Sequence, residues 1–156
     1  GISNIIYTSA GTFTATVSAV AADIFNRRTA GAGTSIIAID ITPEIKTAAT
    51  RGFRLDSFDI IYKISTDTLV AHTVVLYTFN YTDNTAAVPT VATPAITGTL
   101  LTAVNANIRS TNITVDAPAF VTTATSKHVI NITANNNATT VYDLYGCNLL
   151  FSRTTI

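Results

Sequence analysis

The side chains best suited to metal chemistry are two histidines and a single thiol, His72, His128 and Cys147. A zinc site would need all three to converge with a carboxylate, because protein zinc is usually held by four nitrogen, sulfur or oxygen ligands. Their spacing matches no known ligand pattern, and His128 shares the alternation of Ile130 and Ile132. We therefore expect no metal and no cofactor, and interpret the histidines as satisfied or exposed residues at strand starts.

Catalytic constellations are equally weak. Serine, histidine and aspartate all occur, yet the sequence has no G-x-S-x-G elbow that would mark a nucleophile. Asp56 and Asp59 are the closest pair of carboxylates for glycoside hydrolysis. Their offset of three places them on opposite faces of a regular strand, unless a bulge realigns them, so we favour solvated or turn-stabilising aspartates. We expect that the protein is not an enzyme.

Two sets of residues could act in binding. Arg27 and Arg28 lie in a segment rich in glycine and small residues, and are expected either to anchor a loop to carboxylates of a neighbouring subunit or to be solvated. The tyrosines could stack on sugars, or could be core and cross-strand pairs; they are Tyr77, Tyr81, Tyr142 and Tyr145. The absence of tryptophan disfavours the sugar hypothesis.

The elements that must position these residues are strands. Apolar and polar residues alternate with period two, and threonine and other β-branched residues are abundant while glutamate and lysine are scarce. We predict an all-β, antiparallel two-sheet β-sandwich, jelly-roll-like, with eight or nine strands, in a single domain over residues 1–156. The expected strands are residues 12–20, 35–42, 53–65, 72–82, 96–101, 111–121, 127–134 and 140–153.

Several local features are predicted within these strands. The apolar phase slips between Leu55 and Phe58, which places a β-bulge near Asp56 and Ser57. Residues 135–137, three asparagines, are expected to form a tight hairpin turn. The strand at 72–82 is expected to be central, and the last strand to be paired on both sides. One helical turn is expected in residues 43–50.

Charge excludes some partners. Nine basic and nine acidic residues give zero net charge, and the charged fraction of 12% is about half the usual share. Such a chain has no electrostatic footprint for direct contact with nucleic acid. No window approaches 18 consecutive apolar residues, so we expect no membrane span. A surface with few charges suits a molecule that packs against copies of itself.

Four segments of the chain are distinctive when taken together: RGFRLDSFDIIYKIS, AHTVVLYTFNYT, ITVDAPAF and VYDLYGCNLLFSR. In texture and strand order they resemble small β-sandwich virion structural proteins of tailed bacteriophages, of the head-decoration and head-fibre type. The resemblance implies a virion-exposed protein, made in the host cytoplasm, that assembles as a symmetric oligomer, often a trimer, with other virion proteins. It brings no catalytic residues.

We therefore expect a capsid decoration or minor surface protein that acts through subunit interfaces. Apolar residues near the start of the chain suggest a covered segment; they are Ile2, Ile5, Ile6 and Tyr7, and Arg27 and Arg28 are the other interface candidates. Two alternatives stay open. One is a carbohydrate-binding or host-attachment module with a surface glycan as ligand, and the other is a major jelly-roll coat protein.

Overall fold

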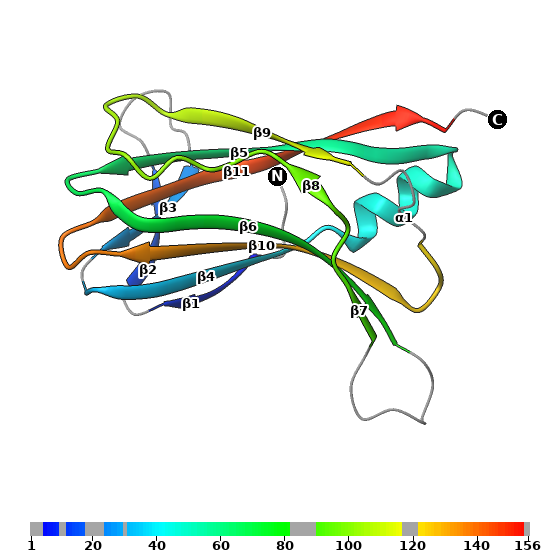
Figure 1. The fold of residues 1–156 in the computed structure, drawn as a ribbon, viewed down its shortest axis with the longest axis horizontal. Helices are drawn as coiled ribbons and strands as arrows, with labels where there is room; N and C mark the ends of the chain where they lie inside the picture. The colour runs from blue at the N-terminus through cyan, green and yellow to red at the C-terminus, as the bar shows by residue number, and fades with distance from the viewer. Residues whose placement is uncertain are drawn as a thin grey trace.

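Two antiparallel sheets pack face to face in the computed structural model (Figure 1). The structure describes residues 5–9, 12–17, 24–29, 31–81, 90–116 and 122–154. Within them, the first sheet has the order β1-β4-β10-β6-β7 and the second the order β2-β3-β11-β5-β9-β8. The predicted all-β, antiparallel two-sheet sandwich is confirmed.

The elements run in this order: β1 (Ile5–Ser9), β2 (Thr12–Val17), β3 (Ile24–Thr29), β4 (Gly33–Asp40), α1 (Thr42–Thr50), β5 (Phe53–Ser65), β6 (Leu69–Asn80), β7 (Thr90–Ala92), β8 (Ile96–Thr97), β9 (Arg109–Val115), β10 (Ser126–Asn136) and β11 (Val141–Arg153). The described residues thus hold eleven strands, more than the eight or nine predicted. Three of them, β1, β3 and β7, lie outside the expected strands.

The core lies between the sheets and is built largely from isoleucines. On the first sheet, Ile39 is paired with Ile130, and Ile37 with Ile132, and all four side chains are fully buried. The second sheet contributes fully buried Phe58, Ile60, Tyr62, Ile64 and Tyr142. β-Branched side chains fit a pleated, covered surface, so the alternation seen in the sequence becomes one buried face per sheet.

A bulge interrupts β5 at the predicted place. Leu150 pairs with Ser57 and Phe151 pairs with Leu55, so Asp56 is the extra residue. The bulge lets Leu55 and Phe58 both face the core in spite of their odd spacing. This prediction is confirmed.

A second bulge, which the sequence pattern did not indicate, lies in β11. Leu144 pairs with Tyr62 and Gly146 with Ile61, which leaves Tyr145 unpaired in the ladder. The buried apolar residues before the bulge are Tyr142 and Leu144. As predicted, β11 is paired on both sides, with β3 and β5.

The turn after β10 is not a hairpin. β10 belongs to the first sheet and β11 to the second, so the chain crosses between sheets at residues 137–140. The Asn136 side chain is buried and donates to the Gly33 and Ala134 carbonyl oxygens. The prediction of a tight hairpin at residues 135–137 is therefore wrong, because one of these asparagines acts through its side chain as a cross-strand anchor.

Two further predictions concern β6 and the helix. β6 is not central, because its first half pairs with β10 alone and β7 joins only at residues 78–80. The expected helical turn is a nine-residue helix, α1, which carries Pro43 in its first turn and lies at one end of the sandwich (Figure 1). Proline in the first helical turn needs no amide hydrogen. No helix among the described residues is long and apolar enough to cross a membrane.

Candidate functional site

His72 is a buried structural residue on β6. Its Nδ1 lies 3.0 Å from the Leu101 carbonyl oxygen, to which it must donate, and its Nε2 lies 3.0 Å from the Tyr142 hydroxyl. The rings of Tyr62 and Tyr142 both meet the imidazole edge to face. Burial lowers the pKa of His72 to about 4. The ring is therefore neutral at pH 7 and has both nitrogens in use.

His128 plays a similar part on β10. Its Nδ1 lies 3.0 Å from the Thr78 hydroxyl and its Nε2 lies 3.1 Å from the Thr122 hydroxyl. Burial, with a contribution from the Lys46 ammonium, lowers its pKa to about 4. The expectation of satisfied histidines agrees with these contacts, although both residues lie on a buried sheet face.

The histidines and the thiol do not converge. His128 on β10 is paired with Thr78 on β6. His72 lies six residues before Thr78 on the same strand, so the two histidines are about 20 Å apart at the usual rise of a strand. Cys147 belongs to the other sheet, where burial raises the pKa of its thiol to about 12. The residues that the structure describes contain no cluster of three metal-ligating side chains.

Arg27 and Arg28 lie on β3, not in a loop, so the predicted anchoring loop is wrong. Arg27 holds Asp143 on the adjacent β11 through two hydrogen bonds, Nε to Oδ1 at 2.7 Å and Nη2 to Oδ2 at 2.9 Å. This bond to Asp143 raises the pKa of Arg27. The carboxylate that meets Arg27 thus belongs to the same chain.

Arg28 faces the interior. Its side chain is fully buried and donates to the carbonyl oxygens of Thr140 and Gly31. Burial lowers the pKa of this guanidinium. A buried arginine held by carbonyl oxygens fixes β3 to the start of β11, and its side chain does not reach the surface where a neighbouring subunit would meet it.

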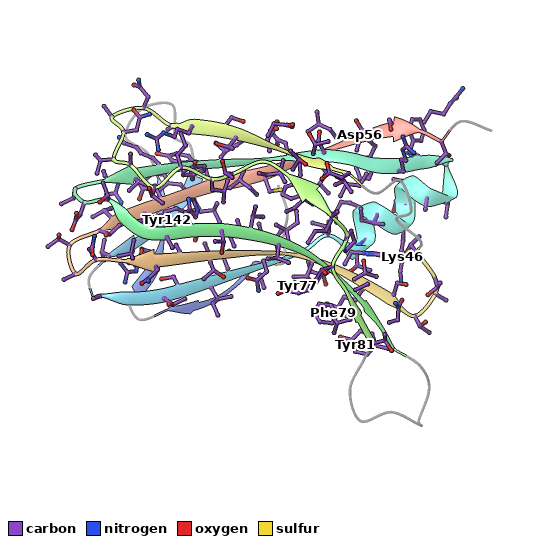
Figure 2. The ribbon with its side chains drawn as sticks, viewed as in Figure 1. Lys46, Asp56, Tyr77, Phe79, Tyr81 and Tyr142 are labelled. Carbon is purple, nitrogen blue, oxygen red and sulfur yellow. The ribbon has the colours of Figure 1, made fainter. Side chains whose placement is uncertain are left out.

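Asp56 and Asp59 share the outer face of the second sheet because the β5 bulge realigns them. Asp56 is exposed and accepts a hydrogen bond from Ser152 at 3.3 Å, whereas Asp59 accepts one from Asn112 at 2.7 Å (Figure 2). Both carboxylates thus bind neighbouring strands, as expected for solvated aspartates.

A pocket of about 450 Å³ lies beside α1, where the ends of β5 and β11 meet the helix. Phe53 and Phe151 line its apolar side, and Glu44 and Arg51 line its polar side. None of the histidines, Cys147 or the aspartate pair contributes to it. The pocket therefore brings together no group that the sequence singled out.

Residues 98–108 form an irregular segment that joins β8 to β9, both in the second sheet, and contacts the start of β6 in the first sheet; we call it the strap. The Leu69 amide on β6 donates to the Thr102 carbonyl oxygen at 2.9 Å, and the Asn105 amide donates to the Ile64 carbonyl oxygen on β5 at 2.9 Å. The Leu101 amide donates to the Tyr62 hydroxyl at 2.8 Å and the Leu101 carbonyl oxygen accepts from His72, which joins the strap to these two buried rings.

The strap displays apolar side chains that the strand pattern did not reveal. Leu101 is 52% exposed, Val104 45% and Ile108 49%, and Val70, beside the anchored Leu69, is 60% exposed. The signal in the sequence is that residues 98–108 contain no charged side chain. We call these four residues the strap patch.

An aromatic row follows the outer face of β6, formed by Tyr77, Phe79 and Tyr81. The rings of Tyr77 and Phe79 have centroids 5.7 Å apart, and Tyr81 is exposed just beyond the strand end. Figure 2 shows the three side chains one after another where β6 leaves the sandwich body to pair with β7. Of the four tyrosines considered for sugar stacking, Tyr142 is buried and Tyr145 stacks on Phe25.

The apolar residues near the start of the chain belong in part to the first sheet. Ile5, Ile6 and Tyr7 lie on β1, an edge strand, and pair with Ile39, Ala38 and Ile37 of β4. Ile2 lies outside the described residues. Because β1 completes a sheet, removing it would change the fold as well as any interface.

No family model matches this chain, and no curated protein matches it. Among solved structures, the chain is similar to one described as "Structural basis for the promiscuous specificity of the carbohydrate-binding modules from the beta-sandwich super family". The TM-score is 0.52 at 10% sequence identity, and the match covers 94% of this chain and 56% of that one. At this identity the likeness shows the sandwich fold, and this chain spans little more than half the length of its neighbour.

Proposed function

We propose that this chain is a non-catalytic structural subunit that acts by packing against copies of itself and other proteins of a larger particle, as a virion surface protein does. The observation that carries the proposal is the strap patch. Leu101, Val104 and Ile108 are exposed on a segment without charges, and Val70 is exposed at the end of β6 that this segment contacts. Apolar surface gathered in this way is typical of protein interfaces.

The strap holds this surface in a fixed shape. Besides its bonds to β5 and β6, its Ala103 carbonyl oxygen accepts a hydrogen bond of 2.8 Å from Arg109, and the Asn107 amide donates to the Asn105 side chain at 3.0 Å. A backbone held at so many points loses little entropy when a partner binds. The strap patch is thus prepared for contact without a folding step.

The charge distribution supports the same function. Charged residues make up 12% of the chain and cancel to zero, so approaching copies meet little repulsion. Interface cores are depleted in charge. Soluble homo-oligomers usually close with cyclic symmetry, which is compatible with the trimer that the resemblance implies.

The test is the state of assembly of the full chain. We expect native mass spectrometry and sedimentation to show an oligomer, and expect Val104→Asp combined with Ile108→Asp to shift it to monomer with an unchanged circular dichroism spectrum. Leu150→Asp is the control, because Leu150 is similarly exposed, at 43%, on β11. A wild-type chain that stays monomeric at high concentration, with no partner in the particle, would remove the proposal.

Sugar binding is a second candidate function, and the aromatic row favours it. Tyr81 is exposed and Tyr77 and Phe79 are half-buried, so part of each ring is available to stack on a ligand. The structural neighbour, described as belonging to a study of carbohydrate-binding modules, shares the sandwich fold. The two functions are compatible, because the aromatic row and the strap patch are made of different residues.

A further inference from the structure

We infer that the aromatic row is a binding site for a neutral, unbranched saccharide that lies along β6. This inference rests on the second candidate function and assigns it a place and a class of ligand. The alternation of β6 fixes the orientation of the row: Leu76 and Thr78 are buried toward the core, so Tyr77 and Phe79 face outward.

Apolar side chains on the two neighbouring strands flank the aromatic row. Tyr77 is paired with Val129 on β10, and Val129 is buried although it faces outward. On the other side, Phe79 is paired with the exposed Val91 of β7. Tyr77, Phe79 and these two valines therefore form a small apolar platform that extends from β10 across β6 to β7.

Polar groups border this platform on one side. Phe79 is also paired with Lys127, and Val129 with Asp40. The Lys127 ammonium lies 4.0 Å from the Asp40 carboxylate. The border thus offers one donor group and one acceptor group whose charges cancel.

An aromatic platform bordered by one donor and one acceptor group fits a sugar better than other ligands. A pyranose ring has apolar C–H faces and a rim of hydroxyl groups, so it can stack on aromatic faces while its hydroxyls bond to polar groups beside them. The cancelled charges of Lys127 and Asp40 give no preference for an anionic ligand. Because the three aromatic residues follow one strand, successive rings can meet successive units of an unbranched chain.

The experiment is affinity electrophoresis of the full chain in gels that contain xylan, mannan, β-1,3-glucan or hydroxyethyl cellulose, with alginate as the anionic comparison. We expect at least one neutral polysaccharide to retard the wild-type protein and alginate not to do so. Phe79→Ala and Tyr81→Ala should each weaken binding about tenfold or more, as the loss of one stacking ring implies.

Two further variants make the result specific. Phe79→Tyr keeps the ring and should keep the binding, and Thr73→Ala, at an exposed position near the start of the same strand and outside the strap patch, should leave it unchanged. Circular dichroism and the unfolding midpoint show that each variant is folded, and Tyr81→Ala lies beyond the strand end, where the fold depends on it least.

The possible results distinguish an error in the location of the binding site from an error in the sugar-binding function itself. If the wild type binds a neutral polysaccharide and the row variants bind equally well, this site is wrong while sugar binding stands. If the wild type binds none of the four, both are wrong. If only alginate retards it, or if the row variants change the oligomeric state instead of binding, the saccharide inference is overturned.

Discussion

The ion pair between Arg27 and Asp143 shows how a single contact can support a sheet. The Asp143 side chain is only 1% exposed, and both of its oxygens accept hydrogen bonds from Arg27. A buried carboxylate that loses its partner retains the cost of desolvation. The stability of the β3–β11 pairing therefore depends on this arginine more than on an ordinary surface charge.

Arg27→Ala should lower the free energy of unfolding by about 1–3 kcal/mol. Arg27→Lys should recover only part of the loss, because an ammonium cannot form the two parallel bonds. Urea unfolding followed by circular dichroism measures both. Arg153→Ala is the control, since this arginine is exposed, and an effect of the same size there would contradict the explanation.

The buried histidines predict a dependence of stability on pH. Burial holds the pKa of His72 and His128 near 4 in the folded protein, whereas histidines of the unfolded chain titrate near 6.5. As pH falls, the unfolded chain takes up protons first, so stability present above about pH 6.5 is lost progressively toward pH 4. For His72 the full shift corresponds to about 3 kcal/mol.

Urea midpoints measured between pH 7.5 and pH 4 check this expectation. His128→Gln places an amide between Thr78 and Thr122 and removes one titrating group, so its curve should be shallower than that of the wild type. Equal slopes for the two proteins would show that other groups cause the pH dependence.

At the scale of elements, the close approach of β8 to β9 depends on Gly98. Its φ is +137°, and a Cβ there would lie 2.8 Å from the Asn112 carbonyl oxygen and 2.8 Å from the Ile113 Cδ1. Both neighbours belong to β9, whose backbone is fixed by its pairing with β5. The positive φ and the short distances each disfavour any residue other than glycine.

We expect Gly98→Ala to lower the free energy of unfolding by about 1–3 kcal/mol and to loosen the strap that follows it. Hydrogen exchange of the Leu101 and Asn105 amides measures the second effect. Thr99→Ala, at the exposed neighbouring position, should change neither quantity. Unaltered exchange in Gly98→Ala would mean that the strap is held independently of β8.

How far the sequence predicts these elements depends on where polar residues lie. The β5 bulge was predictable because apolar residues on both sides of it keep a clear phase. β3 was not, because Arg28 occupies an inward position that an apolar residue usually takes, and its hydrogen bonds to distant carbonyl oxygens are set by tertiary structure. The β11 bulge at Tyr145 was not predictable from the sequence, because apolar residues occur on both faces of the strand there.

At the scale of the whole molecule, composition predicted the sandwich but not its connections. The asparagines at residues 135–137 are typical of turns, yet turn chemistry does not say whether the two strands share a sheet. The candidate surfaces were predicted in part. Tyr77 and Tyr81 were recognised as possible ligand-stacking residues, whereas the strap patch was not, because exposed apolar residues in an irregular segment have no periodic pattern.

The order of strands also constrains how the chain can fold. β10 lies between β4 and β6 in the first sheet, and β11 lies between β3 and β5 in the second. In each sheet, the strands on the two sides of this position are therefore connected only through one of the last two strands of the chain. Before these strands dock, the earlier ones have open edges and contacts that span long stretches of chain. Domains with such non-local contacts fold slowly and pass through states prone to aggregation. We therefore expect both sheets to close late and cooperatively, when the two C-terminal strands dock.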